Sequence, residues 1–284
     1  MTRVIGPDGR GVVVATADPR RAAGHRVWLE DRGIPAEVPA DLGLRAMPRS
    51  DQFEPGADPR LEQARFWATA VRRPSVVVHD DIVSHASPGG DAGVDAPDAV
   101  LDLLERSLDV MPPRRIAVFG GAWVREDEPE YAEAAAFARR CAEAGVEVVT
   151  GGYGGVMGAA SRAASDAGGA AIGITVGTFS ERVPVNESLT HEIQADDVFA
   201  RFPLICDAEA WVAFPGGVGT LTEIALCWSL VQTGSVSPRP LVIVGQRWDR
   251  ALATFRELLL AEHVHFDLIR PAPTGEEAFG LVAG

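Results

Sequence analysis

From residue 115 onward, short apolar runs alternate regularly with helix-like segments, and this alternation leaves few folds open to the chain. Strands are predicted at Ile116–Phe119, Val146–Thr150, Ala171–Val176, Ala210–Phe214 and Leu241–Val244. Helices are predicted at Tyr131–Ala144, after the Gly151–Gly155 cluster through Ala167, and at Asp197–Asp207 and Thr220–Gln232. A last helix, Trp248–Glu262, follows the fifth strand. Strands this short and apolar, alternating with helices, are typical of a parallel sheet covered on both faces. We therefore predict an α/β protein with a Rossmann-like, doubly wound parallel sheet.

Glycine clusters follow three of the predicted strands, at residues 120–121, 151–155 and 216–219. In a parallel sheet covered by helices, ligands bind beyond the carboxyl ends of the strands, so these clusters are expected at one edge. One interpretation is that they are only tight strand-to-helix turns. Three clusters on the same edge of one sheet favour a ligand site.

The most informative stretch is Pro215-Gly216-Gly217-Val218-Gly219-Thr220-Leu221-Thr222-Glu223, which joins a predicted strand to a helix. Glycine lets the backbone approach a ligand closely, and the free N–H groups of a first helical turn favour phosphate. Thr220 can cap the helix and add a hydroxyl donor. Glu223 follows Gly219 by one helical turn, about 5.4 Å along the axis, so the ribose attached to a bound phosphate would lie beside its carboxylate. The spacing predicts a nucleoside monophosphate as ligand and not a free base.

This Pro-Gly-Gly-x-Gly-Thr-x-x-Glu stretch resembles the signature of the Lonely Guy family, phosphoribohydrolases that release cytokinin bases from their ribotides and are often labelled lysine decarboxylases. The resemblance covers about residues 115–262. It includes Thr150–Met157, similar to a glycine-rich segment of the family, and Val198–Arg201, similar to the segment with the family's catalytic arginine.

Three positions depart from the family pattern. Phe202 stands where the family usually has lysine, Ala122 replaces a hydroxyl with a methyl group, and Tyr153 replaces the third glycine of the glycine-rich segment. These departures bear on the substrate more than on the reaction.

The resemblance implies hydrolysis of the N-glycosidic bond of a nucleoside 5′-monophosphate, giving free base and ribose 5-phosphate. Glu223 would stabilise the positive charge that develops on the sugar, and Arg201 would lie near the leaving base or the reacting centre. The residues expected to bind the phosphate and the rest of the substrate are Gly121, Gly152, Gly155, Met157, Gly216, Gly217, Gly219 and Thr220. No cofactor and no metal is expected.

Two alternatives remain beside a cytokinin-type hydrolase. One is a non-catalytic carrier of a nucleotide or cofactor, as in molybdenum cofactor carrier proteins, and the other is a biosynthetic nucleotide hydrolase with an unusual base. The presence of both Glu223 and Arg201 favours an enzyme, because carriage alone needs no carboxylate at the ribose. Members of the family are dimers, which implies a homodimer packed through Thr220–Gln232, a helix apolar on more than one face.

Composition excludes several other functions. All 26 basic residues are arginine, so a pyridoxal phosphate Schiff base and a Walker A lysine are both impossible. The formal net charge of −14 disfavours nucleic acid polymers and anionic membranes as partners.

Three widely separated cysteines (Cys141, Cys206 and Cys227) are expected to be buried thiols. Without a run of signal-peptide or membrane-span length, a cytoplasmic location is expected.

The chain before this region is less regular. Residues 1–92 are expected to form a small α/β unit of unknown role, and residues 93–284 the nucleotide-binding catalytic domain. Within the first part, strands are predicted at Gly11–Thr16 and Ser75–His79 and helices at Arg20–Asp31 and Leu61–Arg72. Ser87–Pro97 is predicted to be a linker, followed by a helix at Asp98–Leu108.

Overall fold

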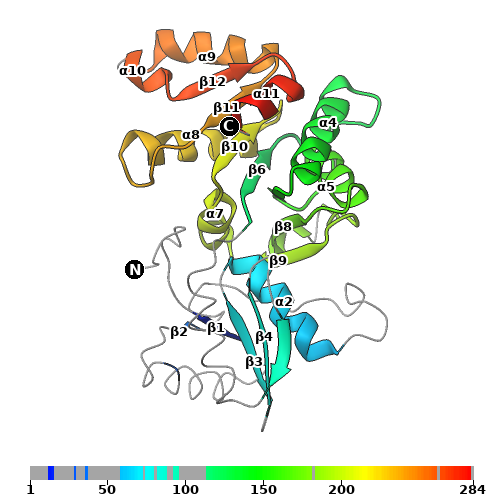
Figure 1. Cartoon of the computed structure of the whole chain (residues 1–284). Helices are drawn as coiled ribbons and strands as arrows, with labels where there is room; N and C mark the ends of the chain where they lie inside the picture. Colours follow the sequence, from blue (N-terminus) through cyan, green and yellow to red (C-terminus); the bar gives the residue numbers. More distant parts are fainter. Residues whose placement is uncertain are drawn as a thin grey trace. The chain divides into compact units, whose positions relative to one another are not determined.

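The computed structural model of the 284-residue chain (Figure 1) describes residues 12–15, 29, 36–37, 58–72, 74–79, 82–87, 92–95, 113–180, 183–260 and 263–282. The chain divides into two compact units. The smaller comprises residues 1–113 with Ile193–Ala200, and the larger comprises Arg114–Glu192 with Arg201–Gly284.

A seven-stranded sheet has the order β12-β11-β10-β6-β7-β8-β9; six of its strands lie in the larger unit, and the edge strand β9 begins there. Its strands are β6 (Arg115–Phe119), β7 (Glu147–Thr150), β8 (Ala171–Val176), β9 (His191–Ala195), β10 (Ala210–Ala213), β11 (Leu241–Val244) and β12 (Ile269–Ala272). All neighbouring pairs from β12 to β8 are parallel. From β6 the chain moves outward through β7 and β8, then returns to place β10 on the other side of β6. This reversal defines a doubly wound sheet, as predicted.

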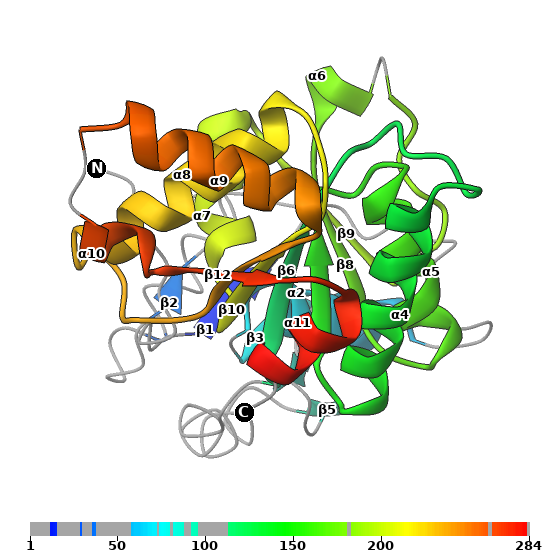
Figure 2. The same cartoon turned by 90° about the horizontal axis from the view of Figure 1, so that it is seen from above.

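Helices cover both faces of this sheet (Figure 2). They are α4 (Pro129–Glu143), α5 (Val156–Asp166), α6 (Gly177–Ser180), α7 (Val198–Cys206), α8 (Val218–Gln232), α9 (Gln246–Leu258), α10 (His263–Phe266) and α11 (Gly275–Val282). The helices α4, α5 and α11 lie on one face, and α8 and α9 lie on the other. On the first face, small residues such as Ala134, Ala138 and Ala160 are fully buried against the strands. They allow the helices to pack closely on the sheet.

Most predicted elements of this unit are confirmed, with ends that differ by a few residues. The strands β9 and β12 and the helix α11 lie outside the predicted pattern. Both strands are at sheet edges, and their sequences are not continuous apolar runs. In β12, Pro271 lacks the N–H that a central strand position needs, which is compatible only with an edge.

The smaller unit contains a five-stranded sheet with the order β2-β1-β3-β4-β5. Its elements are β1 (Val12–Ala15), β2 (Ala36–Glu37), α2 (Pro59–Val71), β3 (Ser75–His79), β4 (Ile82–Ala86) and β5 (Ala92–Asp95). The predicted strands at β1 and β3 and the predicted helix at α2 are confirmed. The linker prediction for Ser87–Pro97 is wrong in part, because β5 forms there and pairs antiparallel with β4. The helix predicted at Asp98–Leu108, and all of Arg20–Asp31 except Leu29, lie outside the described residues.

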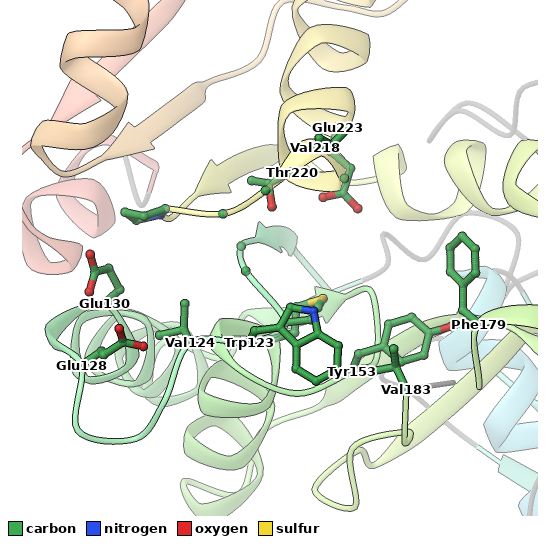
Figure 3. Close-up of a pocket in the computed structure, with 18 of the residues that line it drawn as sticks. Trp123, Val124, Glu128, Glu130, Tyr153, Phe179, Val183, Val218, Thr220 and Glu223 are labelled. Atoms are coloured by element: carbon green, nitrogen blue, oxygen red, sulfur yellow. The ribbon is translucent and has the colours of Figure 1, made fainter. Parts of the chain in front are cut away.

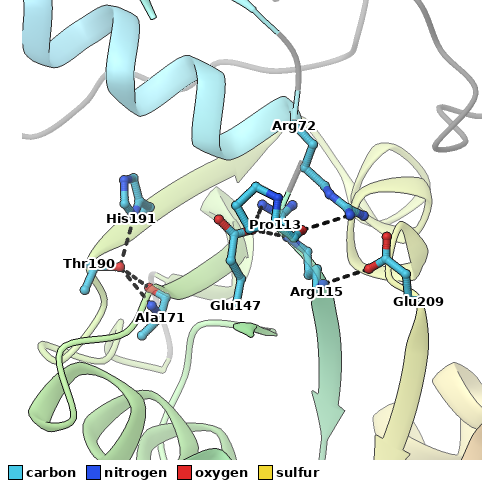
Figure 4. A network of polar contacts seen from close by, with 8 residues as sticks. All are labelled: Arg72, Pro113, Arg115, Glu147, Ala171, Thr190, His191 and Glu209. Carbon is cyan, nitrogen blue, oxygen red and sulfur yellow. Dashed lines mark hydrogen bonds and ion pairs between the residues drawn. The ribbon is translucent and has the colours of Figure 1, made fainter. Parts of the chain in front are cut away.

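A buried ionic network fixes the start of the central strands in the larger unit (Figure 4). Arg115 and Glu147 are register partners on β6 and β7, and Oε2 of Glu147 accepts hydrogen bonds of 2.6 and 3.0 Å from the guanidinium. The backbone N–H of Arg115 donates to Oε2 of Glu209 at 2.7 Å. A one-residue slip of β6 against β7 would separate these charges, so the network specifies the register.

Candidate active site

A cavity of about 590 Å³ opens in the larger unit at the carboxyl ends of β6, β7 and β10 (Figure 3). Its walls are the loops that follow these three strands, together with Phe179, Val183, Arg201 and Arg247. Cavities of roughly 300–1,000 Å³ are typical of small-molecule sites. The position beside the β6–β10 reversal is where doubly wound sheets bind their ligands.

The loops after β6 and β10 are in direct contact along one wall of the cavity. The backbone N–H of Gly121 donates to the carbonyl of Pro215 at 3.0 Å. A side chain at Gly216 would collide with Oγ1 of Thr220, and it would also lie 2.8 Å from the Gly121 nitrogen. Glycine at 216 is therefore required by the close approach of two backbones.

Gly217 and Gly219 have a different environment. A methyl group at either position would meet no atom within 4 Å, and neither residue has a positive φ. Packing and backbone conformation therefore do not require glycine at these positions. Both residues line the cavity, so the space above the first turn of α8 is open to a ligand.

Glu223 lies one helical turn after Gly219 on α8 and also lines the cavity. Its side chain is buried, and burial raises the pKa of Glu223 to about 7, although the nearby Arg201 guanidinium opposes this rise. Oε1 of Glu223 lies 3.9 Å from Nη2 of Arg201. The two residues predicted to be catalytic are thus neighbours in one cavity.

Arg201 on α7 is held in position from two directions. Its Nε–H donates to the carbonyl of Ile174 at 2.8 Å, and its Cζ lies 5.9 Å from the centre of the Tyr153 ring. A side chain at Gly151 would collide with Nη2 of Arg201. Gly151, which the sequence places in a glycine cluster without singling it out, is therefore the residue that admits the guanidinium.

The remaining predicted residues divide into two groups. Met157 lines the cavity, as do Gly121 and Thr220. Gly152 and Gly155 do not line it. They have φ values of +81° and +63° and pack tightly against neighbouring backbone and side chains, so their glycines shape the loop after β7.

Several residues that line the cavity were not among the sequence candidates. The aromatic ones are Trp123, Tyr153 and Phe179, and the charged ones are Glu128, Glu130 and Arg247. Only Trp123 and Tyr153 carried a sequence signal, because Tyr153 lies within a glycine cluster and Trp123 lies two residues after one. Phe179 and Arg247 reach the cavity only through the folding of distant segments.

The charged groups of the cavity are already paired. Arg247 lies 3.4 Å from Oε1 of Glu130, and Oε2 of Glu128 accepts a hydrogen bond from the backbone N–H of Arg125. With the Arg201–Glu223 pair, the cavity contains three carboxylates and two guanidinium groups. An anionic ligand would therefore be held mainly by backbone N–H groups.

Within the described ranges, no three His, Cys, Asp or Glu side chains gather as a metal site would require. Cys141, Cys206 and Cys227 are buried free thiols, as predicted, and burial raises the pKa of Cys141 to about 12. Every helix in this part of the chain is too short or too polar to span a bilayer.

The sheet and the cavity define a doubly wound α/β protein with a small-molecule site at its topological switch. Residues 157–278 match the family model described as "Possible lysine decarboxylase". This match confirms, over that segment, the family resemblance inferred from the signature. The comparison with curated proteins gives no match.

The solved structures that are similar to the chain include two molybdenum cofactor proteins. The molybdenum cofactor binding protein from Rippkaea orientalis is 22% identical, with 61% of this chain and 96% of that chain covered and a TM-score of 0.49. The molybdenum cofactor carrier protein from Chlamydomonas reinhardtii is 25% identical, with 61% and 99% covered and a TM-score of 0.46.

Proposed function

We propose that the protein hydrolyses the N-glycosidic bond of a nucleoside 5′-monophosphate and releases the free base and ribose 5-phosphate. The observation that carries this proposal is the buried Glu223–Arg201 pair, which shares one cavity with the open first turn of α8. A site that only stored a nucleotide would not need a desolvated carboxylate beside the sugar.

The phosphate is bound at the start of α8. Gly217 and Gly219 leave room there, and the N–H groups of the first helical turn point toward that space. Gly121, Gly216 and Thr220 complete the wall around it. Backbone donors suit this task because each arginine of the cavity lies within 4 Å of a carboxylate, which offsets its charge toward an anion.

The reaction breaks the bond between C1′ of the ribose and the base nitrogen, and its electron pair leaves with the base. The Glu223 carboxylate stabilises the positive charge that remains on the sugar. Water adds its oxygen to C1′ and loses one proton, and the base gains one. Arg201, next to Glu223, stabilises the electron density on the departing base.

The test is incubation of the full-length protein with AMP, GMP, CMP and UMP and with the corresponding nucleosides, with free base detected by chromatography. Base release from at least one monophosphate, and much less from its nucleoside, is expected. Charge-assisted hydrogen bonds to the phosphate are each worth about 1.5–3 kcal/mol, so the nucleoside should react far more slowly. Tight binding of monophosphates without any base release would instead favour a nucleotide or cofactor carrier.

We also propose a homodimer that packs through α8. An apolar groove of about 240 Å³ lies between α8 and α9. Its walls include Leu221, Ile224, Trp228, Trp248, Leu252 and Phe255. A second copy of α8 would cover this surface, which is consistent with a helix that is apolar beyond its core-facing side. Light scattering at micromolar concentration should give the mass of two chains, and a monomer mass would contradict the proposal.

A further inference from the structure

Trp123 is a large aromatic side chain that the protein leaves open to the cavity. It lies between β6 and α4, and it is 78% exposed. By contrast, Trp211, Trp228 and Trp248 each donate their indole N–H to a backbone carbonyl. Among the described residues, none accepts a hydrogen bond from the indole of Trp123. Most of its surface and its N–H group are therefore available to a ligand.

The exposure of Trp123 is not caused by a loosely held loop. On one side of it, the N–H of Gly121 donates to Pro215. On the other side, Val124 packs against the buried core, and the backbone N–H of Arg125 donates to the Glu128 carboxylate at 2.7 Å. The backbone is fixed on both sides, so the indole is presented to the cavity by a defined conformation.

Two more aromatic side chains, Tyr153 and Phe179, line the cavity with Trp123. Tyr153 is anchored because its hydroxyl donates to the carbonyl of Val176 at 3.2 Å and accepts from the N–H of Val176 at 3.0 Å. Its ring lies 6.4 Å from that of Phe179, which is 40% exposed. Figure 3 shows Trp123 beside Tyr153 and across the cavity from Thr220 and Glu223. The cavity thus has a polar wall on α8 and an aromatic wall facing it.

We propose that Trp123 determines specificity by stacking its indole on the aromatic base of the bound nucleotide while the ribose faces Glu223. This inference rests on the proposed function, because it takes a nucleotide as the ligand. Aromatic side chains stack on any flat heterocycle, since every base has a π-face. The wall therefore selects nucleotides with an aromatic base over sugar phosphates that lack one.

The test measures binding by calorimetry in the Glu223→Gln background, where turnover is suppressed. The probes are AMP, GMP, CMP and UMP, compared with ribose 5-phosphate, which lacks a base. Trp123→Ala should weaken binding of the best monophosphate about tenfold or more and leave ribose 5-phosphate unchanged. Trp123→Phe, which keeps a flat ring, should restore most of the affinity.

Phe199→Ala is the matched control, because Phe199 is 83% exposed and does not line the cavity. It should change neither affinity, and thermal unfolding should show that all variants remain folded. The proposal is overturned if Trp123→Ala weakens ribose 5-phosphate as much as the nucleotide, or if it weakens neither. It is also overturned if no monophosphate binds more tightly than ribose 5-phosphate.

These outcomes are separable from failure of the proposed reaction. A protein that binds nucleotides through Trp123 without cleaving them would disprove hydrolysis and retain the stacking role. A protein that cleaves nucleotides with equal affinity in the Trp123→Ala variant would retain hydrolysis and disprove the stacking role.

Discussion

Two buried Arg–Glu pairs lie at opposite ends of the large sheet, and their geometries differ. At the amino ends of the strands, Arg115 and Glu147 form hydrogen bonds as short as 2.6 Å (Figure 4). At the carboxyl ends, Nη2 of Arg201 lies 3.9 Å from Glu223, beyond hydrogen-bonding distance. All four side chains are nearly inaccessible to solvent, so burial alone does not explain the difference.

The two pairs differ in whether the carboxylate oxygens are already hydrogen-bonded or still able to accept hydrogen bonds. The Arg115–Glu147 pair connects register partners on adjacent strands, and its charges satisfy one another. The Arg201–Glu223 pair connects two helices across a cavity and leaves the carboxylate oxygens of Glu223 without a hydrogen bond in the described part of the chain. A closed pair stabilises a fold, whereas an open pair is available to a ligand.

The largest expected effect is on stability, at the closed pair. Glu147→Ala would remove the carboxylate that accepts two hydrogen bonds from the buried Arg115 guanidinium, and breaking a buried ion pair commonly costs about 3–5 kcal/mol. Chemical denaturation should therefore show a strongly lowered midpoint. Glu187→Ala, on an exposed surface carboxylate, is the control and should change little. A midpoint unchanged in Glu147→Ala would show that the closed pair does not stabilise the fold.

The next effect is on catalysis, at the open pair. Glu223→Gln keeps the size and reach of the side chain but removes its charge, so kcat should fall about 10²–10³-fold. Nucleotide affinity should change only modestly, because the phosphate contacts lie around Gly216–Thr220. Single-turnover kinetics and calorimetry measure these two quantities. Full turnover in the variant would mean that Glu223 is not catalytic.

The open pair should also set the pH dependence of the reaction. Burial raises the pKa of Glu223 to about 7, and the charged form is the one that stabilises the sugar cation. The kcat/KM should therefore rise with pH through about 7 and fall about tenfold per unit below it. A flat profile between pH 5.5 and 8.5 would indicate that ionisation of Glu223 does not control the rate.

The smallest effect concerns the space above α8. Gly219→Ala introduces a methyl group that meets no protein atom, so stability should change by at most about 0.5–1 kcal/mol. The methyl group should nevertheless weaken AMP binding, because it occupies the space assigned to the phosphate. Gly280→Ala on α11 is the matched control, since its methyl group is equally free of contacts. Equal AMP affinity in both variants would mean that the phosphate does not bind at the start of α8.

The central strands of the large sheet can be predicted from the sequence, but its edge strands and the Arg115–Glu147 pair cannot. Strands such as β6 and β10 are recognisable because they are short and, apart from Arg115 at the start of β6, apolar. The edge strands β9 and β12 are not, since half-buried positions and Pro271 disrupt the pattern. Arg115 and Glu147 are single polar residues at strand ends, and nothing in the sequence pairs them.

Part of the candidate site could be predicted because its residues lie close together in the sequence. Glu223 and the glycines before it lie within nine consecutive residues, so their spacing on one helix start is local information. The approach of Arg201 to Glu223 depends on how α7 and α8 pack, and the sequence supports it only through a family resemblance. The aromatic wall requires Trp123, Tyr153 and Phe179 to converge from three segments, which only tertiary structure establishes.

The reversal of strand order at β6 and β10 has an evolutionary consequence. The aromatic wall comes from residues before 192, whereas Arg201, Glu223 and the first turn of α8 all come from residues after 200. In the proposed function, selectivity for the base and the chemistry of bond cleavage are thus encoded in separate, contiguous lengths of the gene. Recombination between them could exchange one leaving group for another without touching the groups that break the bond, and chimeric proteins joined between β9 and α7 would reproduce that step in the laboratory.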